Sequence, residues 1–341
     1  AQKKLAETIG ADGQQLLSAI YAPESPAWLG EVPAVEILRQ VWVQQYVFRE
    51  GEVKWRTAKD LPPNKLMIES PYDVEARNQT KRSTNWTGYA AHLTETCDQD
   101  TPNLITHVET TPATTGDVNM TETIHAALAE KELLPREHVV DTNYVEARNL
   151  VSSQAEYGID LLGPARFDSS WQARTEGGYA LACFAIDWQG QTVTCPQGQI
   201  SHGWRLSTNE DGREATVARF HPQDCLGCTE RSNCTQTKQH PRVLKFRPQA
   251  QYEALQAARE RQETSDFKER YKTRAGVEGT VSQGTRSFDL RRARYIGLAK
   301  THFQHIVIAA AMNLTRAVSW LDGHPKARTR CSRFAALASA G

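Results

Sequence analysis

The chain has 341 residues, 23% of them charged and 39% hydrophobic, which is the composition of a globular protein and excludes wholesale disorder. Its longest unbroken apolar run, Ile306 to Met312, is far shorter than the roughly 20 residues that cross a bilayer. The first residues, from Ala1 to Leu5, form no hydrophobic signal segment. We therefore expect a soluble, cytoplasmic protein without a membrane partner, built as one large domain with an insertion or as two smaller domains.

The charges balance over the whole chain, with 40 Lys and Arg against 40 Asp and Glu, but they are unevenly distributed. Residues 242–341 contain 19 of the basic side chains and 8 of the acidic ones, and the remainder of the chain is acidic. Such a basic segment is typical of proteins that bind nucleic acid. The alternative is a basic layer that neutralises the acidic part of the same fold, and charge alone does not separate the two.

Residue patterns along the first half of the chain predict alternating helices and strands. Residues 1–60 have helical periodicity in two segments, and Leu61 to Asn64 interrupts it. Further along, the pattern predicts a hairpin (86–96 with 104–111), a helix (119–134), a strand (137–141), a helix (144–153) and a strand (159–163). This order is typical of a mixed α/β sheet.

Residues 165–247 interrupt that order with turns and short strand-like runs at 179–188 and 214–220. After residue 248 the pattern is helical. Apolar residues recur there at spacings of three and four, which favours a buried face: Phe303, Ile306, Val307, Ala310, Leu314, Val318 and Leu321.

Four of the seven cysteines are grouped within 165–247, at Cys195, Cys225, Cys228 and Cys234, and the other three are isolated. Without a secretion signal, metal binding is favoured over a disulfide framework. Four thiolates around Zn²⁺ would form a closed structural site. The alternative is a set of reduced thiols in a loop, and only one true Cys-x2-Cys pair is present.

Two acidic residues are candidates for chemistry. Asp141 ends the apolar run Val139–Val140, where a carboxylate would project from the end of a strand into the ligand crevice of an α/β fold. Its alternative role is the N-cap of the following helix. Glu278 lies between Gly276 and Gly279, with Tyr271 and Arg274 expected on the same helix face. Its alternative role is a surface ion pair with Arg274.

The pattern Tyr271-x2-Arg274-x3-Glu278 resembles the catalytic-glutamate signature of DDE transposases from bacterial insertion sequences. Further segments resemble one branch of that group, in the same order along the chain: Ser70–Arg77, Trp86–Tyr89, His92–Cys97, Leu104–Thr111, Trp171–Arg174, Cys195–Gly198, Arg274–Thr280 and Arg294–His302.

The resemblance implies an RNase H-like catalytic fold in which three carboxylates hold two Mg²⁺ (or Mn²⁺) ions, with Asp141 as the second Asp and Glu278 as the Glu. Tyr271 and Arg274 would support the site. The reaction implied is cleavage of double-stranded DNA at the element's ends and transfer of the freed 3′-hydroxyl into target DNA, and two cations suit that phosphodiester chemistry. DNA contacts would come from Arg286, Arg291, Arg292, Arg294 and Lys300, and the protein would act as a homodimer, nucleoid-associated when bound.

The same resemblance divides the chain into a helical N-terminal segment (1–64), the first part of the RNase H-like core (65–164), a Cys-rich insertion with a possible structural zinc (165–247) and a helical part of the core that carries Glu278 (248–341).

The branch places its first Asp in an Asp-Ser-Thr strand that this chain does not contain, so we expect that an N-terminal part is missing. Asp73 is the only nearby substitute. Asp141-Thr-Asn-Tyr144 and Ala90 also depart from the family pattern and bring activity into question. A non-catalytic DNA-binding remnant of a transposase is therefore the alternative, and an RNase H-like nuclease that only hydrolyses DNA is a third reading.

Overall fold

The computed structural model of the chain describes residues 2–81, 83–209, 212–324 and 326. It divides into two compact units, each treated by itself below: unit 1 takes residues 1–116 and 274–341, and unit 2 takes residues 117–273. No helix in the described ranges is both long and apolar enough to pass through a membrane.

Unit 1 begins with two helices, as the periodicity predicts: α1 (Gln2–Ile20) and, after a 3-10 turn η1 (Ala27–Glu31), α2 (Pro33–Gln45). Pro33 suits the first turn of α2, where its missing N–H is not needed. A hairpin that the pattern did not indicate follows, with strands β1 (Tyr46–Arg49) and β2 (Glu52–Trp55). Its turn places Glu50 and Gly51 at positive φ, 54° and 80°, the conformation that tight hairpins require.

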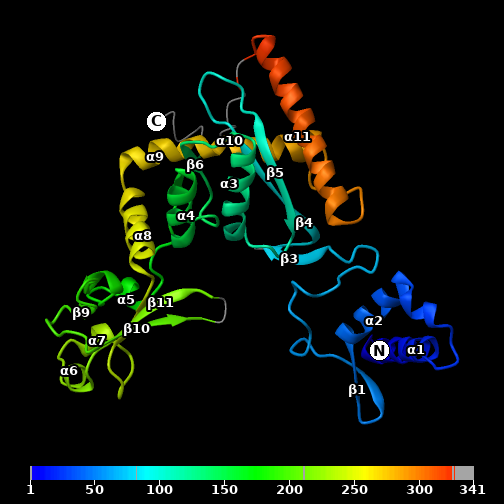
Figure 1. Cartoon of the computed structure of the whole chain (residues 1–341), viewed down its shortest axis with the longest axis horizontal. Helices are drawn as coiled ribbons and strands as arrows, with labels where there is room; N and C mark the ends of the chain where they lie inside the picture. Colours follow the sequence, from blue (N-terminus) through cyan, green and yellow to red (C-terminus); the bar gives the residue numbers. More distant parts are fainter. Residues whose placement is uncertain (1, 82, 210–211, 325, 327–341) are drawn as a thin grey trace, which may run out of the picture. The chain divides into compact units, whose positions relative to one another are not determined.

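The principal sheet of unit 1 is antiparallel, with strands β3 (Arg77–Lys81), β4 (Thr84–Glu95) and β5 (Ile105–Pro112) in that order. The pairing of β4 with β5 confirms the predicted hairpin. Helix α11 (Leu298–Leu321) packs along β5 (Figure 1). The buried core there combines Ile105 and Val108 of the strand with Ala309 and Met312 of the helix.

The expectation that the apolar stripe of α11 is core is wrong within unit 1. Phe303 is 65% exposed and Leu314 68%, and the helix buries a more polar face instead: Thr301, Gln304, His305, Ala309 and Met312. The physical reason is that β5 offers backbone groups and hydroxyls. The Asn313 side chain accepts from the Ile105 N–H at 2.7 Å and donates to the Ile105 carbonyl at 2.8 Å, and His305 Nδ1 lies 2.9 Å from Thr110 Oγ1.

Unit 2 contains the predicted helix–strand–helix–strand order. It begins with a 3-10 turn η2 (Asp117–Asn119) and continues with α3 (Met120–Glu130), β6 (Glu137–Val139), α4 (Ala147–Tyr157) and β7 (Asp160–Leu162). Strands β6 and β7 are parallel, and α4 ends at Gly158, which adopts the left-handed conformation of a helix terminus. Helix α8 (Gln249–Arg261) packs against α4, and α9 (Ser265–Tyr271) follows it.

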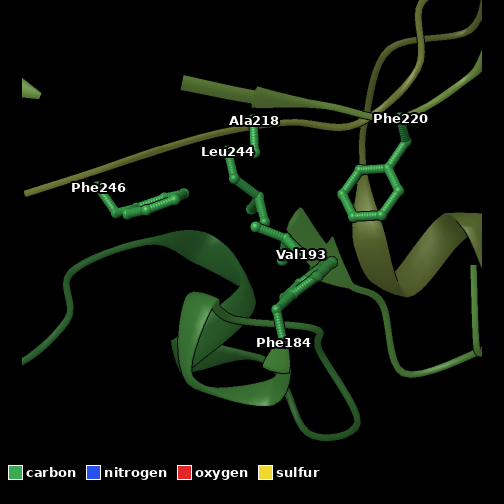
Figure 2. Close-up of a cluster of buried hydrophobic side chains, with 6 residues drawn as sticks. All are labelled: Phe184, Val193, Ala218, Phe220, Leu244 and Phe246. Atoms are coloured by element: carbon green, nitrogen blue, oxygen red, sulfur yellow. The ribbon is translucent and has the colours of Figure 1, made fainter. Parts of the chain in front are cut away.

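The Cys-rich stretch of unit 2 has a hydrophobic core of its own, formed by Phe184, Val193, Ala218, Phe220, Leu244 and Phe246 (Figure 2). Its elements are α5 (Trp171–Arg174), η3 (Leu181–Cys183), β8 (Ala185–Asp187), β9 (Thr192–Thr194), β10 (Gly203–Thr208), β11 (Glu214–Arg219), α6 (Pro222–Leu226), α7 (Arg231–Cys234) and β12 (Val243–Phe246). The predicted strand at 214–220 is confirmed, whereas only 185–187 of the run 179–188 is a strand.

The fold is therefore mixed α/β with small antiparallel sheets and helices toward the C-terminus, as the sequence indicates. Within the described ranges, β3–β5 and β6–β7 belong to separate sheets. A single RNase H-like sheet thus stays a prediction, and so do the four segment boundaries.

A buried histidine pair in unit 2 predicts a pH-dependent stability. His125 Nε2 and His138 Nδ1 lie 2.9 Å apart, and burial lowers the pKa of each to about 4. Free histidine titrates near pH 6.5, so between about 6.5 and 4 the unfolded chain binds protons that the folded chain does not. We expect a lower midpoint of thermal unfolding at pH 5 than at pH 7.

The variant His125→Gln should flatten this pH dependence, whereas His240→Gln, at an exposed position in the same unit, should leave it unchanged. Thermal unfolding followed by circular dichroism between pH 5 and 7 gives the midpoint of each variant. If the midpoint changes equally with pH in both variants, the histidine pair does not cause the pH dependence.

Candidate functional site

Asp141 lies directly after β6, at the carboxyl end of the parallel pair β6–β7. The Val140 N–H continues the pairing by donating to the Leu162 carbonyl at 2.8 Å, and Asp141 Oδ1 accepts the Thr142 N–H at 2.7 Å. Helix α4 begins six residues later, at Ala147, with Glu146 at its N-cap, so the alternative of an Asp141 helix cap is wrong. A half-buried carboxylate at this end of parallel strands has the placement of a ligand-binding residue in α/β folds.

Glu278 lies in the first turn of helix α10 (Ala275–Ser287), where a carboxylate is favoured by the helix dipole. Its side chain is 72% exposed, and Arg274 Nη1 lies 3.1 Å from Glu278 Oε1. The ion pair of the alternative reading is thus present. At such exposure it contributes only about 0–1 kcal/mol, and it leaves a role for Glu278 in binding open.

Tyr271, Arg274 and Glu278 do not lie along one continuous α-helix, contrary to the expectation from their spacing. Helix α9 ends at Tyr271, a 3-10 turn η4 (Lys272–Arg274) follows, and α10 begins at Ala275. In unit 2, Tyr271 stacks on Phe267, with ring centroids 5.5 Å apart and planes at 10°. Because Tyr271 belongs to unit 2 and the other two residues to unit 1, a face shared by all three stays a prediction.

Helix α10 is anchored to the sheet of unit 1 by a buried polar network that the sequence did not reveal. Glu95, at the end of β4, has a side chain only 2% exposed and accepts hydrogen bonds from Arg316 of α11, at 2.9 Å, and from the Thr280 hydroxyl. Arg316 also lies 2.5 Å from Thr280 Oγ1 and 2.7 Å from the Asn103 carbonyl. One network therefore ties β4, α10 and α11 together, and α10 carries Glu278.

The two glycines that flank Glu278 differ in their surroundings. A Cβ at Gly276 would lie 3.0 Å from the Asn103 amide and 3.4 Å from Glu95 Oε1, so the sheet of unit 1 lies close to the backbone there. At Gly279 a Cβ would meet nothing within 4 Å.

Asp73 has a structural role within unit 1. Its Oδ1 accepts from the Tyr89 hydroxyl at 2.7 Å and from the Glu75 and Ala76 N–H groups at 3.3 Å, and its Oδ2 accepts from the Gly297 N–H at 3.1 Å. Burial, together with the hydrogen bond to this carboxylate, raises the pKa of Tyr89. With both oxygens holding the β3–β4 region and the start of α11, Asp73 is a poor substitute for a missing metal ligand.

The five basic residues expected to contact DNA are all exposed in unit 1. Arg286 lies in the last turn of α10, and the others follow in the connection to α11 and its first turn: Arg291, Arg292, Arg294 and Lys300. Arg294 forms an ion pair with Asp289 at 3.0 Å.

Other arginines of the basic segment neutralise acidic residues of their own unit. In unit 2, Arg247 pairs with Glu146 at 3.1 Å and Arg261 with Asp160 at 2.6 Å. The charge-neutralising reading therefore applies to this part of the segment, and DNA binding by the exposed residues stays a prediction.

The four grouped cysteines line one small cavity of unit 2, whereas Cys97 and Cys183 are exposed elsewhere and Cys331 lies outside the described residues. The Gln199 N–H donates to Cys195 Sγ at 3.3 Å. Burial raises the pKa of the Cys234 thiol. Nowhere in the described ranges are three or more His, Cys, Asp or Glu side chains already arranged to hold a metal ion.

Asp141 belongs to unit 2 and Glu278 to unit 1, so the meeting of the two carboxylates at one site stays a prediction. The role of Tyr271, in unit 2, and of Arg274, in unit 1, beside them is likewise a prediction.

Comparison with known families identifies one match: residues 194–318 match the model of a transposase DDE domain. The matched range contains the four grouped cysteines, the Tyr271–Glu278 signature and all five exposed basic residues, and it begins after Asp141. It supports a DDE transposase. Neither curated proteins nor solved structures gave a significant match to the chain.

Proposed function

We propose that this chain is the catalytic region of an insertion-sequence transposase, which cleaves DNA at the ends of its element and transfers the freed 3′-hydroxyl to target DNA. The observation that carries the proposal is the match of residues 194–318 to a transposase DDE domain. The range includes Glu278, whose surrounding residues resemble the family's glutamate signature. The position of Asp141 at the carboxyl end of the parallel pair β6–β7 supports a second acidic ligand.

The donor set suits the divalent cation that DDE transposases normally use. Carboxylate oxygens are hard ligands of the kind that Mg²⁺ prefers, and Asp141 and Glu278 would hold the ion. When bound, the ion neutralises charge on phosphodiester oxygens during cleavage and transfer. The chain's own contribution is orientation: the Thr142 N–H positions Asp141 Oδ1, and the anchored helix α10 positions Glu278.

The exposed residues Arg286, Arg291, Arg292, Arg294 and Lys300 would contact the DNA backbone. We further propose an RNase H-like catalytic fold, a homodimer that brings two DNA ends together, and a location in the cytoplasm on the nucleoid. Each follows from the assignment as a transposase.

Nicking of supercoiled plasmid DNA tests the proposal, in a full-length protein that adds to this chain an Asp-Ser-Thr strand as the source of the third carboxylate. We expect conversion to the open circle in Mg²⁺ or Mn²⁺, none in EDTA, and a loss of nicking in Asp141→Asn. A chain that binds the plasmid but never nicks it would favour the non-catalytic DNA-binding alternative. Release of short fragments without any joined product would favour a nuclease that only hydrolyses DNA.

The exposed basic residues predict a steep salt dependence of DNA binding. Each phosphate contact contributes about −0.9 to the slope of log K against log salt concentration. The double variant Arg291→Gln, Arg292→Gln should therefore make the slope less steep by about 2. Fluorescence anisotropy with a labelled duplex measures the slope. The control is Lys59→Gln, a change at an exposed position in the turn at 57–60, which should leave the slope unaltered. If the unaltered chain, the double variant and Lys59→Gln all give the same slope, Arg291 and Arg292 do not contact DNA.

A further inference from the structure

We propose that Cys195, Cys225, Cys228 and Cys234 form a structural Zn²⁺ site that closes the loop between β11 and β12. The site is independent of the transposase chemistry, because it lies wholly within unit 2 and needs neither Asp141 nor Glu278. Its basis is the arrangement of the four thiols, the lack of buried residues in the loop that carries three of them, and the positive charge beside them.

The cavity brings together cysteines that are far apart along the chain. Cys195 follows β9, whereas Cys225, Cys228 and Cys234 lie on and between the short helices α6 and α7, and all four line the same cavity of about 30 Å³. Cys195, Cys225 and Cys234 also pack against the hydrophobic core shown in Figure 2. Three separate segments are thus already brought to one place by a core that does not depend on metal.

Backbone amides donate to two of these sulfurs, one from a local turn and one from a distant segment. The Cys195 N–H donates to the Gln199 carbonyl at 2.8 Å, Gly198 adopts a φ of 80°, and the Gln199 N–H returns to donate to Cys195 Sγ at 3.3 Å. At Cys225, the Arg242 N–H donates to Sγ at 3.5 Å. Amide donors aimed at sulfur stabilise the charged thiolate, which is the form that binds metal.

The loop that carries Cys225, Cys228 and Cys234 contributes no buried residue of its own, although two of these cysteines touch the neighbouring core. None of residues 221–243, all of which the structure describes, is buried. Its two helices, α6 and α7, span only five and four residues. Loops of this kind are held by a metal or by cross-links where hydrophobic burial is insufficient, and the binding free energy of a structural zinc then stabilises the folded form.

Two guanidinium groups at the cavity wall would balance the charge of a four-thiolate zinc site, which carries a net charge of −2. Arg231 donates to the Cys225 carbonyl and Arg242 to the Cys234 carbonyl, each at 2.9 Å. Among the described residues neither arginine forms an ion pair with a carboxylate, and Arg242 Nε is buried without a hydrogen-bond partner. The four thiolates with their zinc ion would therefore supply the negative charge that balances the guanidinium groups of Arg231 and Arg242.

Zinc binding would draw the four side chains closer together, since Zn–S bonds measure about 2.3 Å and the thiols are not yet in that geometry. Each thiol loses its proton as its Zn–S bond forms. Because the chain segments are already adjacent, the change needed is a rotation of side chains and a tightening of the 221–243 loop. Metal binding and ordering of the loop are therefore one coupled step.

Elemental analysis of the whole purified chain, expressed without a histidine tag, tests the proposal. We expect about one zinc per chain, as for other closed four-ligand sites, that survives dialysis. Cobalt supplied in place of zinc should give the d–d bands of a tetrahedral thiolate complex. A strong chelator should lower the midpoint of thermal unfolding and expose four further thiols to a thiol reagent.

The matched variants are Cys228→Ser and Cys183→Ser. Cys228→Ser should lose retained zinc and the tetrahedral cobalt spectrum, whereas Cys183→Ser, at an exposed position outside the cavity, should keep both. If Cys228→Ser fails to fold, the cobalt spectrum and chelator response of the unaltered chain still decide the matter. A chain that retains no zinc, shows no tetrahedral cobalt spectrum and has four cavity thiols as reactive as Cys183 would overturn the proposal, whatever its nicking activity.

Discussion

Glu278→Gln is expected to lower metal-dependent plasmid nicking by at least about 100-fold, because loss of groups around a catalytic metal already costs about 10–100-fold and a direct ligand costs more. DNA affinity should change little, since the proposed phosphate contacts are the exposed basic residues 286–300. The change keeps the size and shape of the side chain, removes its charge and replaces one carboxylate oxygen with an NH2 donor. Its direct structural cost is small, because the exposed pair with Arg274 contributes little to stability.

The matched control is Glu269→Gln, which removes the same charge from an exposed glutamate of α9 that pairs with Lys272. It should nick plasmid at the rate of the unaltered chain. Nicking that is undiminished in Glu278→Gln would eliminate the residue as a metal ligand. An equal loss in both variants would point to a general effect of charge on DNA binding.

Arg316→Met should destabilise the chain by about 3–5 kcal/mol, the usual consequence of removing one partner from a buried ion pair. Glu95 would keep its negative charge at a position where its side chain is only 2% exposed, and the bridge from Arg316 to Thr280 and the Asn103 carbonyl would be lost as well. Urea unfolding monitored by circular dichroism measures the change.

Arg294→Met is the matched control for this change, because Arg294 pairs with Asp289 on the surface, where about 0–1 kcal/mol is expected. The double variant Glu95→Leu, Arg316→Met should recover part of the lost stability, since the stranded charge is then absent. If Arg316→Met costs no more than Arg294→Met, the network does not anchor α10.

Most individual elements followed from sequence patterns because their causes are local. The β4–β5 hairpin consists of two strand-like segments around a polar turn, and β6 and β7 end in short apolar runs on either side of a helix. The predicted ends of an element are inaccurate where its residue pattern extends beyond the backbone hydrogen bonds of the strand. The strand-like run 179–188, for example, contains only the three-residue strand β8. The sequence pattern does not predict the hairpin β1–β2, because its four-residue strands contain charged residues. Its turn, Glu50–Gly51, also differs from the Asn-Gly and Asp-Gly pairs that usually mark hairpin turns.

The residues of the candidate site also differ in how far local sequence patterns predict their placement. Asp141 could be located from the sequence, because the end of an apolar run marks the end of a strand. The 3-10 turn between α9 and α10 could not be located, because the spacing rule applied to Tyr271, Arg274 and Glu278 assumes one continuous helix.

Local patterns along the chain are sufficient to predict the class of fold, the order of most helices and strands, and the resemblance to a DDE transposase, since these depend on neighbouring residues. Three features appear only when distant segments pack together: the more polar buried face of α11, the network of Glu95, Thr280 and Arg316, and the cavity shared by the four cysteines. These outcomes depend on which distant groups offer a hydrogen bond, a counter-charge or a packing surface. Spacing along one segment carries no information about the partner on another.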